Sequence, residues 1–402
     1  MTPYREIFSI GEFRALFVAT STSVASKTIE MLAVSVLVYA YTGSPLLAAI
    51  AYLGGFLPQA VGALTLLSLA DRLPPRAAMV AWRVVHAGVV ALLAIGVLPV
   101  WAMLALLMTV GLGDAVVGAI GNTVVVDVVP EGSYVLGRSV LNVSVGAMQI
   151  LGYAAGGALL ALVSPSGALW TAALIGLATA AIVQFGLKRR PPRATGRASV
   201  GATWQGNRVL FGDPAIRRML LAQWLPNGLI VGAEAMFVPY AGDAAGALFA
   251  GAAAGMLVGD VVIGRWTSTR LRSRLALPLY GLLAVPYLAF VARPGPVLAT
   301  AVVALASFGY AGTLAIQERF IATVPDRLLG QGMGLAGSGM MTAQAVCAAI
   351  VGATAELFTP AIAMTAAAVA SLVVSVALLA RPWPAMPAPR ASREATEAAP
   401  LG

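Results

Sequence analysis

Residues 188–213, KRRPPRATGRASVGATWQGNRVLFGD, form the longest polar interval of this 402-residue sequence. On both sides of it the chain consists of apolar stretches of roughly 20 residues, the length that crosses a ~30 Å hydrocarbon core as a helix. Six such stretches precede the interval and six follow it. The polar interval therefore predicts a linker between two six-helix bundles.

The composition supports a membrane protein, since 59% of the residues are hydrophobic and 10% are charged, against about a quarter charged in soluble proteins. We predict an all-α integral membrane protein with twelve transmembrane helices in two pseudo-symmetric six-helix bundles. The expected spans are residues 14–41, 45–70, 76–97, 100–126, 137–163, 167–187, 215–240, 244–266, 275–292, 295–318, 329–357 and 360–381.

The positions of the basic residues predict the orientation. All of them except Lys27, Arg83 and Arg293 fall at a terminus or at every second connection. By the positive-inside rule both termini are cytoplasmic, which requires an even number of spans. We expect an N-terminal bundle (1–187), a cytoplasmic linker (188–213), a C-terminal bundle (214–381) and a disordered tail rich in Pro and Ala (382–402). Because arginine far outnumbers lysine, as in GC-rich bacterial genomes, the expected location is a bacterial plasma membrane.

The two halves of the sequence resemble each other at a shift of about 195 residues. This shift superimposes VVPEG (128–132) on TVPDR (323–327), and it aligns Gln149 with Gln344 and Gly157 with Gly352. Each match is weak alone, but the matches occur in the same order. They indicate two bundles of parallel orientation, an arrangement found among secondary transporters.

A charged motif, SLADRLPPR at 68–76, follows the second apolar stretch. Its Asp71, Arg72 and Arg76 match the motif G-x-x-x-D-R-x-G-R-R/K of the major facilitator superfamily, whereas the two glycines and one arginine of that motif are absent. Together with FRALF (13–17) and TGSPL (42–46), the sequence resembles the branch of that superfamily that contains macrolide and siderophore exporters. The resemblance covers residues 10–380 and implies transport by alternating access.

The resemblance further implies that Asp71, Arg72 and Arg76 form a cytoplasmic gate that latches the outward-facing state. A carboxylate at this boundary can accept hydrogen bonds from a helix N-terminus or from an arginine, and Asp127 and Arg138 are candidate partners. The alternative is that the arginines only anchor the loop on the inner side, but this does not explain an aspartate.

Ionisable residues inside predicted spans are the candidate site, because burying them costs several kcal/mol without a partner or a cavity. Lys27 and Glu30 continue a polar stripe on the first helix, and Asp114 lies on a glycine-rich face of the fourth. Lys27 and Glu30 are close enough to pair with each other or with Asp114. The alternatives are an ion pair that substrate or protons break and a static buried pair.

Glu234 has no basic residue in its own span. Its charged form is therefore costly to bury, and we rank Glu234 first, Asp114 second and Glu30 third as groups for proton coupling. The resemblance implies that helices one, four and seven line the central cavity. The expected cavity-lining residues are Lys27, Asn142, Gln149, Gln223, Asn227 and Gln344.

The motif GYAAGG at 152–157 resembles the antiporter motif G-P-x-x-G-G, with Tyr153 in place of proline. We therefore expect proton-coupled efflux of amphipathic small molecules, with a proton-coupled importer or facilitator of a small nutrient or metabolite as the alternative. Partners are the lipid bilayer, the substrate and protons, and we expect a monomer.

Several other classes are not expected. An ATP-driven pump would need G-x-x-x-x-G-K-[ST], which is absent. One His and one Cys provide no metal cluster or disulfide framework, so no enzymatic activity, metal or cofactor is expected. The sequence offers no folded soluble region large enough to read nucleic acid, so no nucleic-acid partner is expected.

Overall fold

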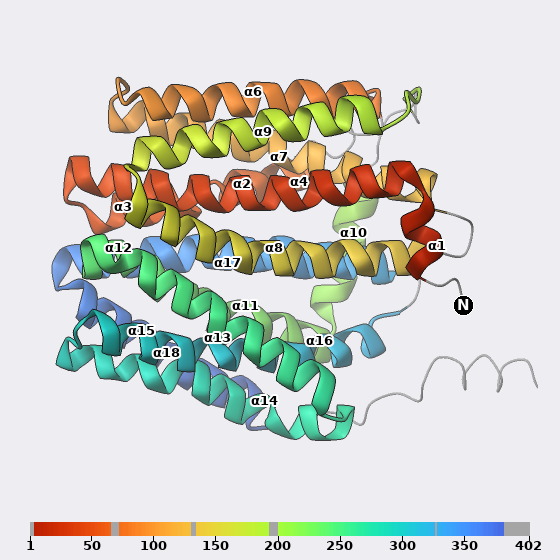
Figure 1. Cartoon of the computed structure of the whole chain (residues 1–402). Helices are drawn as coiled ribbons and strands as arrows, with labels where there is room; N and C mark the ends of the chain where they lie inside the picture. The colour runs from red at the N-terminus through yellow and green to blue at the C-terminus, as the bar shows by residue number, and fades with distance from the viewer. Residues whose placement is uncertain (1–3, 66–71, 130–133, 193–199, 326–327, 382–402) are drawn as a thin grey trace, which may run out of the picture.

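The computed structural model describes residues 4–65, 72–129, 134–192, 200–325 and 328–381 (Figure 1). Within these ranges the chain is helical apart from short connections, and they contain no strand. Asp71 and the C-terminal tail of the sequence analysis lie outside them.

The N-terminal half is built from long helices that run side by side (Figure 1). Its elements are α1 Tyr4–Ser9, α2 Gly11–Thr42, α3 Pro45–Leu53, α4 Phe56–Thr65, α6 Pro75–Ile95, α7 Val100–Val128, α8 Tyr134–Leu162 and α9 Pro165–Gly186. The expected second span contains two helices, α3 and α4, with Gly54 and Gly55 between them.

The C-terminal half repeats this pattern with more interruptions. Its elements are α10 Val200–Gly212, α11 Pro214–Glu234, α12 Phe237–Ala241, η1 Gly242–Ala244, α13 Ala245–Trp266, α14 Thr269–Ala284, η2 Val285–Ala292, α15 Pro296–Phe308, η3 Gly309–Ala311, α16 Gly312–Thr323, α17 Leu329–Leu357 and α18 Pro360–Leu379.

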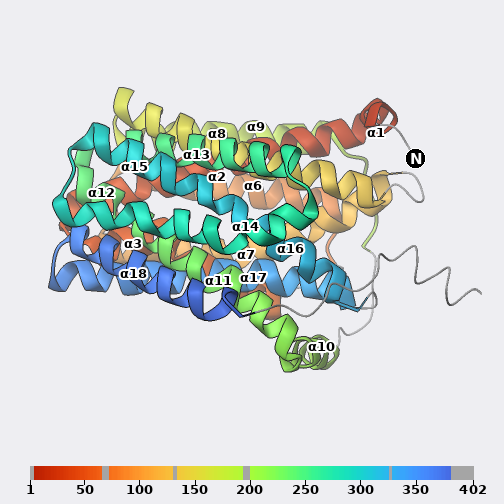
Figure 2. The same ribbon diagram turned by 90° about the horizontal axis from the view of Figure 1, so that it is seen from below.

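The described part of the chain contains ten stretches that are long and apolar enough to cross a membrane. One of these, Pro214–Trp266, contains α11, α12, η1 and α13, and its two long helices, α11 and α13, run in opposite directions on either side of Gly242 (Figure 2). In addition, α8 carries a shorter apolar stretch, Ser144–Leu160. These helices make up the twelve expected crossings, and the protein is a multi-pass membrane protein.

Short turns with the residues that helix ends require separate the spans. Ser44 and Ser164 each accept a hydrogen bond from a backbone N–H of the first turn, and each precedes a proline at the first helical position. Such caps replace hydrogen bonds that the first turn lacks. Gly43 ends α2 at φ 64°, a left-handed conformation that costs glycine little. The turns TGSP and SPSG therefore fix where the chain reverses.

The linker is partly helical, which the sequence analysis did not anticipate. Helix α10 projects from one end of the bundle (Figure 2) and buries Leu210, while Phe211 stacks on Trp224 with ring centroids 6.0 Å apart. Gln331 also donates to Asn207 at 2.9 Å. The signal for this helix within the polar interval was a set of apolar residues, Val200, Trp204 and Leu210. We call this end of the bundle the α10 end.

The described contacts between the two halves concentrate at the end of the bundle opposite the α10 end (Figure 1). There α8 meets α13 so closely that a Cβ on Gly157 would lie 2.5 Å from the carbonyl oxygen of Gly246. On the other side of the interface, α17 meets α3, and a Cβ on Gly352 would lie 2.9 Å from Cα of Leu46. Gly157 and Gly352 are the glycines that the sequence repeat aligned, so the repeat places equivalent close contacts on both sides.

Two polar contacts cross the interface at the same end. Ser44 donates through its hydroxyl to Glu356 of α17, and the backbone N–H of Leu46 donates to the same carboxylate oxygen at 3.3 Å. The Tyr39 hydroxyl lies 3.5 Å from the carbonyl oxygen of Pro239. The halves are thus closed against each other at this end.

Replacing Gly157 with leucine is expected to separate the halves at this end, because the side chain meets backbone that cannot yield. Gly146 lies on the same helix, and a Cβ there meets nothing within 4 Å, so Gly146→Leu is the matched control. Spin labels on cysteines at Tyr41 and Leu357, in a Cys347→Ala background, should report a longer distance only in Gly157→Leu. An equal distance in both variants would show that this contact does not hold the end closed.

Candidate functional site

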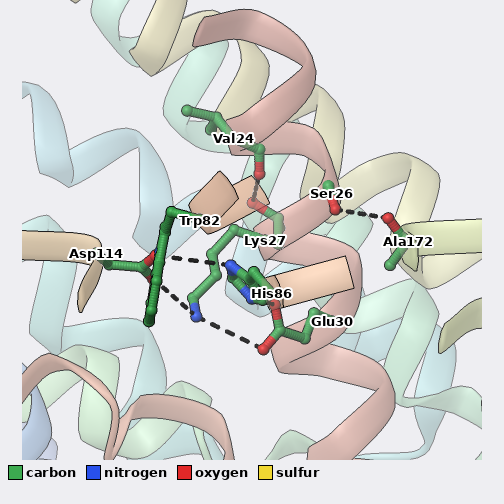
Figure 3. A network of polar contacts seen from close by, with 9 residues as sticks. Val24, Ser26, Lys27, Glu30, Trp82, His86, Asp114 and Ala172 are labelled. Atoms are coloured by element: carbon green, nitrogen blue, oxygen red, sulfur yellow. Dashed lines mark hydrogen bonds and ion pairs between the residues drawn. The ribbon is translucent and has the colours of Figure 1, made fainter. Parts of the chain in front are cut away.

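The N-terminal half contains a buried cluster of charged side chains from three helices (Figure 3). Lys27 of α2 places its Nζ 3.5 Å from Glu30 Oε1 and 3.3 Å from Asp114 Oδ2 of α7. His86 of α6 lies 2.8 Å from Glu30 Oε2 through Nε2 and 3.6 Å from Asp114 Oδ1 through Nδ1. Two carboxylates therefore share an ammonium and an imidazole.

Helical spacing brings these side chains together. Lys27 and Glu30 are three residues apart and share one face of α2. Trp82 and His86 are four residues apart on α6, and the Trp82 indole donates to Asp114 Oδ1 at 2.9 Å. Gly113 leaves the space in which the Trp82 ring packs, since a Cβ there would overlap the ring. The indole and the imidazole thus hold the Asp114 carboxylate between α6 and α7.

The burial of the cluster makes this pairing necessary. Glu30 is 1% exposed and His86 is 7% exposed, and an unpaired charge at such a site costs several kcal/mol. One lysine against two carboxylates leaves one negative charge, which a protonated His86 would neutralise. The cluster can therefore exchange one proton without leaving a carboxylate unpartnered.

Glu234, at the end of α11 in the C-terminal half, is in a different environment. Its side chain is 7% exposed, and the Tyr310 hydroxyl of η3 donates to Oε1 at 3.0 Å. No basic side chain among the described residues lies within ion-pair distance of its carboxylate. This carboxylate therefore has a neutral partner only, unlike Glu30 and Asp114.

The predicted polar lining residues fall into three groups. Asn227 accepts a hydrogen bond from Gln344 at 2.9 Å, which joins α11 to α17, and Gln223 donates to the carbonyl oxygen of Met219 on its own helix at 3.4 Å. Gln149 of α8 is exposed. The side chain of Asn142 lies outside the described residues.

The predicted gate residues are only partly described. Asp71 and the side chain of Arg138 lie outside the described residues, and Arg72 is exposed. Arg76 donates to the Gln184 side chain at 3.3 Å and to the Leu187 carbonyl oxygen at 3.2 Å. These contacts tie the start of α6 to the end of α9.

Asp127 contacts the beginning of the linker. Arg190 lies 3.7 Å from Asp127 Oδ2 and binds both carboxylate oxygens of Glu12, at 2.9 and 3.1 Å. The Lys188 N–H also donates to Glu12 at 2.8 Å. Arg190 therefore joins the start of α2, the end of α7 and the chain after α9, a contact that sequence reasoning missed.

Three further residues of the site were also missed. In the sequence analysis the single histidine, His86, serves only to exclude a metal cluster, although its position well inside a predicted span was a signal for a buried polar partner. The sequence did not distinguish two aromatic residues, Trp82 and Tyr310, from residues of the apolar core. Trp82 lies four residues before His86, and Tyr310 is the partner of Glu234.

Comparison with known proteins places the sequence in a family. The family model described as "Major Facilitator Superfamily" matches residues 16–246. No curated protein sequence matches the chain.

Solved transporter structures share the fold. A bacterial homologue of the human lysosomal transporter Spinster, in an inward-facing and unoccupied conformation, is 14% identical with a TM-score of 0.69, covering 94% of this chain and 96% of that one. A POT family transporter in complex with 5-aminolevulinic acid is 11% identical with a TM-score of 0.70, covering 92% and 95%. The chain belongs to the major facilitator superfamily and is a secondary transporter.

Proposed function

We propose that this protein is a proton-coupled antiporter that exports amphipathic small molecules across a bacterial plasma membrane. In this proposal the α10 end and both termini are cytoplasmic, as the arginine distribution predicts. The resemblance of the sequence to the branch that contains macrolide and siderophore exporters, and the motif at 152–157, favour export over the import of a nutrient. Because the halves meet at the opposite end, the structure then corresponds to the inward-facing arrangement.

Glu234 carries the proposal. It lies next to the contact between the halves, since Tyr39 of α2 reaches Pro239 of α12 just beyond it. A charged carboxylate with only a tyrosine partner is costly to enclose, so enclosing Glu234 requires a proton. When the halves separate at this end, water reaches the charged form and a proton can bind from the outer side. The proton is enclosed as this end closes, and it leaves later toward the α10 end. Proton binding is thereby linked to alternating access.

The cluster around Lys27 supports the same function in the other half. Its carboxylates are already paired. A substrate or a proton that binds there therefore replaces one of the existing partners of a carboxylate. The protein thus has one acidic site with charged partners, around Lys27, and one without, at Glu234. Two different acidic sites are what coupling between protons and a substrate requires. We assign proton transfer first to Glu234, then to Asp114, then to Glu30.

A two-step experiment tests the function. Growth inhibition by a compound panel, with and without expression, identifies compounds that the protein exports. Each such compound is then added outside energised inside-out vesicles, whose lumen is acidic. An antiporter that exports should release luminal protons when the compound enters. A proton-coupled importer needs its substrate inside the lumen. Proton release that occurs only with compound preloaded into the lumen, and not with compound added outside, would therefore show import instead of export.

A further inference from the structure

The N-terminal half contains a cavity of about 220 Å³ on the α10 side of the charged cluster. Its walls come from α2, α6, α7, α8 and α9 and are largely apolar, with Leu16, Val24, Met79, Leu141 and Val145 among the lining residues. Three polar side chains, Thr20, Ser23 and Arg83, also line it. The cavity therefore combines an apolar wall with one cationic group.

Arg83 interacts with Glu30 and Asp114 only through the attraction between their charges, without direct contact. Within the described ranges its guanidinium makes no hydrogen bond and no ion pair. The nearby carboxylates, Glu30 and Asp114, accept from Lys27, His86 and Trp82 instead. A guanidinium carries five N–H donors in a planar fork that suits carboxylates. Leaving them unsatisfied in a membrane-spanning helix is costly, so the site is suited to an external acceptor.

Arg83 also borders a second, much smaller cavity. That cavity, about 10 Å³, is lined by Ser26, Lys27, Arg83 and His86, among others. Its volume is close to what one water molecule needs. Arg83 thus lies between the charged cluster and the larger cavity, and only the larger cavity has room for a ligand.

The hydroxyls of the larger cavity add a second donor. The Thr20 hydroxyl makes no hydrogen bond with any described residue. Ser23 donates to the Ala19 carbonyl oxygen at 2.6 Å, so it can only accept from a ligand. Thr20 and Arg83 are therefore the available donors, and they face one cavity from α2 and α6.

The charges around the cavity do not oppose an anion. Lys27 and Arg83 balance Glu30 and Asp114, and protonation of His86 adds one positive charge. The cluster without Arg83 carries one excess negative charge when His86 is neutral, but Arg83 balances it. Together with Arg83, these side chains are therefore never net negative in either state of His86. A cationic head group, in contrast, would have to approach Arg83 directly.

We propose that Arg83, with Thr20, binds the anionic group of a small amphipathic carboxylate whose apolar part occupies the 220 Å³ cavity. The proposal rests on the proposed transport function and names the substrate class at this site. The volume is below the ~300 Å³ at which pockets for drug-sized ligands begin, so a short hydrocarbon acid fits best.

Calorimetric titration of the full-length protein in zwitterionic nanodiscs tests the proposal with octanoate, octanol and octylamine. Octanoate should bind at least about tenfold more tightly than the other two, because charge-assisted hydrogen bonds form only with the acid. Arg83→Gln should weaken octanoate binding by about tenfold to a hundredfold. Arg270→Gln, which removes an exposed arginine of α14, should leave it unchanged.

Thr20→Val provides a second test if Arg83→Gln does not fold, and it should weaken octanoate binding without affecting octanol. Nanodiscs that contain phosphatidylglycerol distinguish a free acid from a lipid headgroup as the source of the anion. An octanoate affinity that is unchanged in these nanodiscs supports a free acid. Weaker octanoate binding through competition by the lipid, if Arg83→Gln abolishes that competition, would overturn the free acid in favour of a lipid headgroup. Equal binding of octanoate and octylamine, or wild-type octanoate affinity in Arg83→Gln or Thr20→Val, would also overturn the proposal. No proton gradient is present, so a failure of proton coupling alone leaves this result intact.

Discussion

Glu234→Gln is expected to abolish proton release from inside-out vesicles on addition of an exported compound, down to the level of vesicles without the protein. Glutamine keeps the size of the side chain and can still accept from Tyr310, whose hydroxyl lies 3.0 Å from the carboxylate. It cannot bind or release a proton, so the two halves can close without one. The variant should still bind compound and equilibrate it passively.

Asp243→Asn is the matched control, since Asp243 is an exposed carboxylate in η1 close to the same end of the bundle. It should couple like the wild type. Tyr310→Phe removes only the hydrogen bond to Glu234 and should retain coupling with an altered pH dependence. Full coupling in Glu234→Gln would transfer the role to the cluster around Lys27.

Lys27→Met is expected to destabilise the protein by about 3–5 kcal/mol, the usual effect of removing one partner from a buried ion pair. Lys27 is the ammonium that both Glu30 and Asp114 contact, at 3.5 and 3.3 Å. Without it, two buried carboxylates share only His86 and the Trp82 indole. Thermal unfolding in detergent, followed by the fraction of monodisperse protein, measures the loss.

A second substitution tests the electrostatic origin of this effect. In the Lys27→Met background, Asp114→Asn removes the excess negative charge and should recover part of the lost stability. A double-mutant cycle with Lys27→Met, Asp114→Asn and both together measures the coupling between the pair. Additive effects would show that Lys27 stabilises the helix by packing alone.

The spans could be predicted because their signal is local. Length, apolar composition and the charges between spans follow directly from the hydrocarbon thickness and from the cost of burying a charge. The interruptions at Gly54 and Met236 and the helix α10 were less accessible. These features depend on how the helices pack against one another, and a short stretch of sequence carries no information about that packing.

The candidate site was accessible only in part, for the same reason. Lys27 and Glu30 share a helix face, so spacing predicts their proximity, and Asp114 followed from its burial in a span. His86, Trp82 and Tyr310 act through partners on other helices, and the open side of Arg83 is a property of the cavity. Such relations depend on how α2, α6 and α7 pack, which spacing along one helix cannot reveal.

The central claim is that Glu234 holds the exchangeable proton, and infrared titration of the purified protein tests it most directly. The carbonyl stretch of a protonated buried carboxyl is resolved from that of carboxylates and requires no knowledge of the substrate. We predict a band that disappears as the pH rises, that is absent from Glu234→Gln and that persists in Asp243→Asn. The same band, with the same pH dependence, in Glu234→Gln would contradict the account.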